Sequence, residues 1–126
     1  MKIVHDNLIR DSRAAYLIGI GGSGMSGLAR ILNHLGLSVS GSDYKETAVT
    51  QSLRRSGIPV HIGQKTVGFG DADLIIYSTA IGKDHLELKE ARKLGRKVHH
   101  RAEVLASLLN HAETSIGILG DRKAHV

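Results

Sequence analysis

The stretch that decides the fold is residues 14–27, which read Ala-Ala-Tyr-Leu-Ile-Gly-Ile-Gly-Gly-Ser-Gly-Met-Ser-Gly. An apolar run leads directly into Gly19, Gly21 and Gly24, which have the spacing G-x-G-x-x-G. Between a strand and a helix, this spacing allows a tight turn and lets a diphosphate approach bare N–H groups at the helix N-terminus. We therefore predict a nucleotide-binding loop at residues 19–24, called the glycine loop below. The alternative is a turn that only lets the strand and the helix pack closely.

An acidic residue follows the glycine loop at the distance expected of a dinucleotide-binding unit. Residues 37–42 have the pattern of a second strand, and Asp43 lies 19 residues after Gly24. In nucleotide-binding α/β domains, a carboxylate at this place contacts the ribose. We therefore predict that Asp43 faces a nucleoside. The alternative is that Asp43 caps the following turn, as short acidic side chains often do.

The composition indicates one small domain built on aliphatic side chains. The 126 residues are 41% hydrophobic, but only 3% are aromatic and Trp is absent, which suits a buried parallel sheet. There is no cysteine, so disulfides and thiolate metal ligands are excluded, and we expect a cytoplasmic protein. The charged N-terminal residues do not resemble a signal peptide, and no apolar run approaches the roughly 18 residues of a membrane span. We expect neither secretion nor membrane insertion.

The charge balance favours an anionic small ligand over nucleic acid. There are 17 Lys and Arg residues against 12 Asp and Glu residues, which gives a formal charge of +5. The densest basic stretch, residues 92–97, lies at an expected helix end, and few aromatic side chains are available to stack on bases. The eight histidines are scattered, without a pair at metal-ligand spacing on a helix. We therefore predict no nucleic-acid partner and no metal site, while a homodimer is compatible with the sequence.

Strands and helices alternate along the rest of the chain. Helical spacing predicts a helix from the glycine loop to residue 35 and a second over 48–56 with Val49 and Leu53 inward. A third helix is expected to begin at a capping box formed by Asp84 and Glu87. A fourth is expected over 101–110, with Ala102, Leu105 and Leu109 inward. Further strands are expected at residues 59–62, 74–77, 97–99 and 115–119. This alternation predicts an α/β fold: a Rossmann-like, doubly wound parallel sheet of about five strands flanked by helices. We expect the domain to span residues 14–120, between an N-terminal extension (1–13) and a tail (121–126).

Four motifs resemble the N-terminal domain of the Mur ligases. They are the glycine loop with its continuation to residue 29, the triplet Gly41-Ser42-Asp43, residues 78–81 (Ser-Thr-Ala-Ile), and residues 101–103 (Arg-Ala-Glu). The most specific is the glycine loop followed by Met25 and Ser26, because dinucleotide-dependent dehydrogenases rarely combine the extra glycine with the methionine. The resemblance therefore implies a UDP-sugar ligand in place of NAD.

The resemblance implies that such a domain holds UDP-N-acetylmuramate in the alanine-adding members of this family. A central domain binds ATP and Mg²⁺, a third brings the amino acid, and the muramoyl carboxylate is phosphorylated before the amine of L-alanine attacks it. The resemblance gives this chain no catalytic residue and no cofactor of its own. It implies that the diphosphate is held by backbone N–H groups of Gly22, Ser23, Gly24 and Met25. It also implies that Ser42 and Asp43 face the uridine. The opposite wall of the site would be lined by Ser78, Thr79 and Ala80.

Some of these residues also have simpler interpretations. Ser78 and Thr79 also fit a turn at the end of a strand. Arg101 neutralises Glu103, caps the fifth strand, or contacts a ligand or another domain.

The chain departs from the family pattern at three places. Gln64 stands where the family commonly has the histidine near the uridine, and residues 84–87 read Asp-His-Leu-Glu in place of Asp-Asn-Pro-Glu. The family continues after its last strand into Gly-Thr-x-Gly-Lys-Thr, which holds ATP phosphates, whereas Gly120 is followed here by Asp-Arg-Lys-Ala-His-Val. We therefore expect this chain alone to bind UDP-N-acetylmuramate without catalysis. The alternatives are an NAD-binding domain of an oxidoreductase and a stand-alone regulatory or assembly domain.

Overall fold

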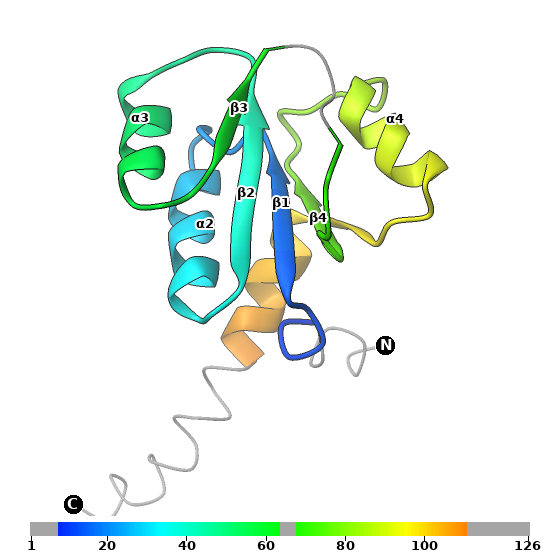
Figure 1. Ribbon diagram of the computed structural model, residues 1–126. Coiled ribbons are helices and arrows are strands. Elements are labelled where there is room, and N and C mark those ends of the chain that lie inside the picture. Colours follow the sequence, from blue (N-terminus) through cyan, green and yellow to red (C-terminus); the bar gives the residue numbers. More distant parts are fainter. Residues whose placement is uncertain (1–7, 64–67, 111–126) are drawn as a thin grey trace, which may run out of the picture.

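The computed structural model describes residues 8–63 and 68–110 and contains one five-stranded parallel sheet (Figure 1). The strand order is β3-β2-β1-β4-β5, so β1 lies in the centre and the chain crosses to the other half of the sheet after β3. The strands are β1 (Ala14–Ile18), β2 (Ser38–Asp43), β3 (Val60–Ile62), β4 (Leu74–Tyr77) and β5 (Val98–His100). The predicted Rossmann-like fold is thereby confirmed.

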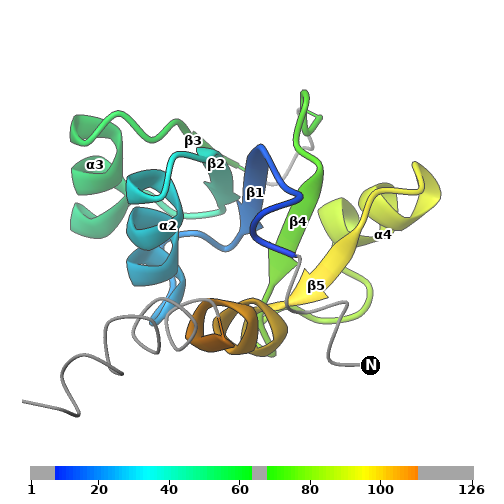
Figure 2. The same cartoon turned by 90° about the horizontal axis from the view of Figure 1, so that it is seen from below.

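Helices cover both faces of the sheet, as Figure 2 shows in the view from below. The helices are α2 (Met25–His34), α3 (Ala48–Arg55), α4 (Leu86–Lys93) and an unlabelled helix described over residues 101–110. Leu17 and Ile76 point to the face covered by α2, α3 and the 101–110 helix, where they join a buried cluster with Leu32 and Val104. The opposite face packs against α4 through a second buried cluster (Tyr16, Ile18, Phe69, Ala72, Ile75, Leu88 and Ala91). The alternation along β1 and β4 follows from the two-residue period of a strand.

The two strands next to the glycine loop approach each other closely. In parallel register, Leu17 of β1 lies beside Gly41 of β2. A Cβ atom at Gly41 would lie 2.4 Å from the carbonyl oxygen of Leu17 and 2.8 Å from the side chain of Ile20. Only glycine fits at this position, which explains the first residue of the Gly41-Ser42-Asp43 triplet in structural terms.

Two helices present a different face to the core from the one that periodicity predicts. In α3, Leu53 is buried as predicted, but Val49 is 39% exposed and Thr50, the partner of Thr47 in the capping box, is buried instead. In the 101–110 helix, Val104 is fully buried, whereas Leu109 is 65% exposed. Ala102 is also exposed, so the predicted inward positions Ala102 and Leu109 were wrong, whereas Leu105 is partly buried and packs against the core as predicted.

Other boundaries differ by less. The cap of α4 is His85, whose Nδ1 accepts the N–H of Glu87 at 3.2 Å, and not Asp84 as predicted. Leu8 and Ile9 are buried in the core, so the stretch before residue 14 contributes to the packing. The strand predicted at 115–119 and the tail 121–126 lie outside the described residues. None of the helices in the described ranges has the length and apolar composition that a membrane span needs.

Candidate functional site

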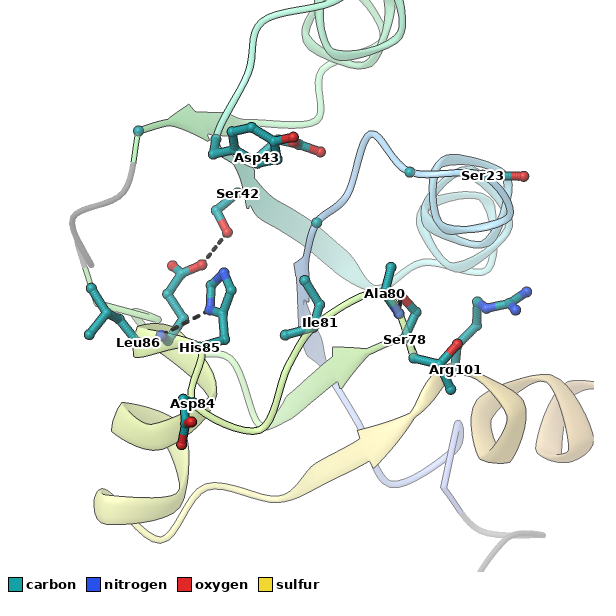
Figure 3. Close-up of a pocket in the computed structure, with 16 residues that line it drawn as sticks. Ser23, Ser42, Asp43, Ser78, Ala80, Ile81, Asp84, His85, Leu86 and Arg101 are labelled. Atoms are coloured by element: carbon teal, nitrogen blue, oxygen red, sulfur yellow. Dashed lines mark hydrogen bonds between the residues drawn. The ribbon is translucent and has the colours of Figure 1, made fainter.

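An open cavity of about 780 Å³ lies at the carboxyl ends of β1, β2 and β4 (Figure 3). This is the point where the strand order reverses, since β2 and β4 continue on opposite sides of β1. Open α/β sheets bind their ligands at such a switch point, and the volume is in the usual range for small-molecule sites. The lining residues are Gly19, Gly22, Ser23, Ser42, Asp43, Tyr44, Gly63, Ser78, Thr79, Ala80, Ile81, Asp84, His85, Leu86, Glu87 and Arg101.

Most of the residues predicted for the site line this cavity. Gly19, Gly22, Ser23, Ser42, Asp43, Ser78, Thr79 and Ala80 all do so. Gly21, Gly24 and Met25 are absent from the lining. Gly21 lies against Asp43, Gly24 lies against Arg101, and the Met25 side chain is buried in the core beneath the loop.

The glycine loop has two N–H groups that remain available to a ligand. The N–H of Gly22 donates to the carbonyl of Gly19 at 3.0 Å, and that of Met25 donates to the carbonyl of Gly22 at 3.0 Å. The N–H groups of Ser23 and Gly24 donate to no described residue. Helix α2 has no acidic residue in its first turn and no side-chain cap, so the partial positive charge of its N-terminus is not offset locally. Of the four predicted donors, Ser23 and Gly24 are therefore the two whose N–H groups have no partner in the part of the chain that the structure describes.

Asp43 holds the glycine loop to the end of β2. Its Oδ2 accepts the N–H of Gly21 at 2.9 Å, and a Cβ at Gly21 would lie 2.9 Å from the same oxygen. The Asp43 carboxylate thus lines the cavity and also fixes the loop that precedes α2. Sequence reasoning predicted a ligand contact or a turn cap, and the contact with Gly21 is a third role that spacing alone did not indicate.

A buried polar cluster lies beneath the cavity, and the sequence analysis missed it. Glu87 is only 4% exposed; its carboxylate accepts the Tyr16 hydroxyl at 2.5 Å and a short hydrogen bond from the Ser42 hydroxyl. Burial, together with the neighbouring Glu87, raises the pKa of Tyr16 well above its usual range. Because the Ser42 hydroxyl donates its proton to Glu87, its remaining lone pairs can only accept a hydrogen bond from a ligand. The available signal was Tyr16 itself, because a tyrosine within an apolar strand needs a partner for its hydroxyl.

Residues 78–80 form both the predicted cavity wall and a turn. The N–H of Ala80 donates to Oγ of Ser78 at 3.3 Å, and the N–H of Ile81 donates to the carbonyl of Ser78 at 3.0 Å. All four residues from Ser78 to Ile81 line the cavity. The strand-end turn and the cavity wall are therefore compatible properties of the same segment.

Arg101 reaches the glycine loop from the start of the 101–110 helix. Its Nη1 lies 2.7 Å from the position that a Cβ of Gly24 would occupy, and its buried Nε has no hydrogen-bond partner among the described residues. The carboxylate of Glu103 instead accepts the N–H of His100 at 2.9 Å and lies 3.3 Å from Nδ1 of His99. Figure 3 shows Arg101 and Ser23 on one side of the cavity, away from His85 and Leu86.

Comparison with known proteins agrees with this geometry. The family described as "Mur ligase family, catalytic domain" matches residues 15–113. The UDP-N-acetylmuramate–L-alanine ligase of Carboxydothermus hydrogenoformans is 49% identical over 102 residues, covering 80% of this chain and 22% of the relative. That of Clostridium beijerinckii is 40% identical over 115 residues, covering 90% of this chain and 25% of the relative.

A solved structure supports the same assignment. The UDP-N-acetylmuramate–alanine ligase of Thermotoga maritima matches with a TM-score of 0.74 at 32% identity, over 78% of this chain and 23% of that chain. The present chain therefore spans about a quarter or less of the length of these relatives and matches their N-terminal region. With the family match over most of its length and the glycine loop at a switch-point cavity, this chain belongs to the Mur ligase family.

Proposed function

We propose that this domain binds UDP-N-acetylmuramate as the nucleotide-sugar module of a UDP-N-acetylmuramate–alanine ligase in peptidoglycan precursor synthesis. The observation that carries the proposal is the cavity at the strand-order reversal, which brings the glycine loop, Ser42 and Asp43 together with the wall at residues 78–80. Relatives that are 40–49% identical over this region are named for that ligase. The proposal thus rests on the geometry of the cavity together with the sequence similarity to these ligases.

The chemistry of the lining supports one orientation of this ligand in the cavity. The diphosphate would lie at the free N–H groups of Ser23 and Gly24, where the N-terminus of α2 attracts negative charge. The nucleoside would lie toward Ser42 and Asp43, with Ser42 accepting a hydrogen bond from a ribose hydroxyl or a base N–H. Residues 78–80 would form the facing wall.

The cavity does not fit ATP with Mg²⁺. The described residues that line it include no lysine, and the sequence contains no Gly-Lys-Thr or Gly-Lys-Ser to cradle a γ-phosphate. Within the described ranges there is also no group of three His, Cys, Asp or Glu side chains placed to hold a metal ion. We propose that ligation needs segments outside this chain and that these 126 residues alone bind without catalysing. Phosphate release from ATP, Mg²⁺, UDP-N-acetylmuramate and alanine, scaling with repurified protein, would overturn this part.

An NAD-binding oxidoreductase domain is the competing assignment. In such domains the carboxylate after the second strand is directed at the ribose. Here Oδ2 of Asp43 accepts the Gly21 N–H, so one of its two oxygens serves the protein's own loop. The other oxygen suits the ribose of either ligand, so our preference for the UDP-sugar over NAD rests on the Mur ligase family match and on the relatives named for that ligase.

The deciding experiment compares ligands by thermal stability and calorimetry on the same protein. A ligand that binds only the native state raises the unfolding free energy by about 2.7 kcal/mol at about a hundredfold excess over Kd. We expect UDP-N-acetylmuramate and UDP to stabilise the domain more than NAD at equal concentration. Equal or greater stabilisation by NAD would favour the oxidoreductase assignment, and stabilisation by none of the three would favour a regulatory or assembly role.

A further inference from the structure

We propose that Arg101 is the cation that neutralises the diphosphate in this cavity and thereby sets the preference for a nucleoside diphosphate over the bare nucleoside. The inference rests on the proposed function and adds a specificity-determining residue to it.

The first argument is position. Arg101 is the first residue of the 101–110 helix, directly after β5, and it lines the cavity. Its guanidinium lies against Gly24, where Nη1 is 2.7 Å from the place a Cβ would take. Gly24 also has a φ of +80°, so the backbone conformation favours glycine there, and the guanidinium occupies the space that a side chain would otherwise take. The loop and the guanidinium are thus fitted to each other.

The second argument is the missing partner. Nε of Arg101 is buried, and no described residue accepts a hydrogen bond from it. Buried polar groups almost always have partners, and the ion pairs among the described residues include none with Arg101. The guanidinium that lines the cavity can therefore bind an anion that enters it. Glu103, two residues away, makes its observed contacts with His99 and with the N–H of His100.

The third argument is the charge of the cavity. Among the described residues, its lining contains three carboxylates, those of Asp43, Asp84 and Glu87, and one Lys or Arg side chain, that of Arg101. An anion that enters meets negative side chains unless a cation offsets them. Arg101 lies on the same side as Ser23, so the guanidinium and the free N–H groups of the loop can contact one phosphate together (Figure 3).

The test is an NMR titration of wild type, Arg101→Gln and Arg101→Lys with uridine, UMP and UDP. We expect Arg101→Gln to weaken UDP binding roughly 10- to 100-fold, the range of a charge-assisted hydrogen bond, and to leave uridine binding within about twofold. Arg101→Lys should recover part of the loss, because an ammonium keeps the charge without the planar fork. Raising the salt concentration should weaken UDP binding more in wild type than in Arg101→Gln.

The matched control is Arg55→Gln, which removes the same charge from the exposed end of α3, away from the cavity. It should bind all three ligands as wild type does. If Arg101→Gln binds UDP as Arg55→Gln does, or loses uridine and UDP equally, the inference is wrong while the proposed function stands. If wild type itself binds neither UDP nor UDP-N-acetylmuramate, the proposed function fails and this inference fails with it. Should Arg101→Gln not fold, the comparison of UDP with uridine in Arg101→Lys decides.

Discussion

The hydroxyl of Tyr16 donates a 2.5 Å hydrogen bond to the carboxylate of Glu87, which lies 71 residues further along the chain. Tyr16 belongs to the central strand β1, and Glu87 lies in the first turn of α4. The Ser42 hydroxyl at the end of β2 donates to the other carboxylate oxygen. One side chain thus ties α4 to two strands directly beneath the cavity.

Removing the Tyr16 hydroxyl should destabilise the fold. Tyr16→Phe deletes a buried hydrogen bond to a carboxylate, and we expect a loss of about 1.5–3 kcal/mol in the free energy of unfolding, measured with urea. Glu87→Ala should cost more, because it leaves the Tyr16 and Ser42 hydroxyls without their acceptor. Tyr77→Phe is the matched control, since Tyr77 contacts His100 only through its ring and should change stability by less than about 0.5 kcal/mol. Equal effects of the two tyrosine variants would contradict the role given to Glu87.

The same hydrogen bond predicts how stability changes at alkaline pH. Burial and Glu87 raise the pKa of Tyr16 above its ordinary value of 10.0, so the folded state keeps the phenol protonated where the unfolded chain would ionise. This contribution is fully present below pH 10 and is lost as the pH rises toward the higher folded-state pKa. Unfolding free energies between pH 8 and pH 11 should therefore fall more steeply in wild type than in Tyr16→Phe. Parallel curves would show that Tyr16 is not the group responsible.

Two glycines near the start of α2 should respond oppositely to alanine. Gly24→Ala places a side chain at a φ of +80° and against Arg101, so we expect a lower melting temperature and weaker UDP binding. Gly27→Ala adds a methyl group at an exposed helical position with nothing within 4 Å, and should stabilise the domain by about 0.5–1 kcal/mol. Differential scanning calorimetry of both variants, with and without UDP, measures the two effects. If Gly24→Ala had the same melting temperature and UDP affinity as Gly27→Ala, the loop would not require glycine at position 24.

Asp43 should affect ligand binding through the loop that it holds. Asp43→Ala leaves the Gly21 N–H without its acceptor, and we expect UDP affinity to fall roughly tenfold as the loop loses its fixed conformation. Asp43→Asn keeps an oxygen acceptor and should retain more affinity. Asp71→Ala, an exposed acidic position outside the cavity, controls for the change in net charge. Wild-type affinity in Asp43→Ala would show that the contact with Gly21 has no part in binding.

Local patterns predicted the parts of this structure that depend on neighbours in sequence. The glycine loop and the buried strand β4 are recognisable because backbone conformation and a continuous apolar run leave a local signature. The inward positions Ala102 and Leu109 of the 101–110 helix were wrong because its rotation is set by the core cluster that Val104 joins with residues of the sheet and α2. The Glu87 cluster joins three distant segments, so no local window reveals it; the sequence assigned that glutamate only to a helix start.

The cavity is divided between the two halves of the sheet, and this has a consequence for how the domain could be taken apart. The segment from β1 to β3 contributes the glycine loop, Ser42 and Asp43, whereas the segment from β4 onward contributes the 78–80 wall, Glu87 and Arg101. Neither segment has a whole cavity. A chain cut between β3 and β4 would yield two fragments, and the pocket would be rebuilt only when they reassemble. A nucleotide that binds the rebuilt pocket would stabilise the complex of the two fragments. The domain could then serve as a pair of fragments whose complementation depends on the ligand.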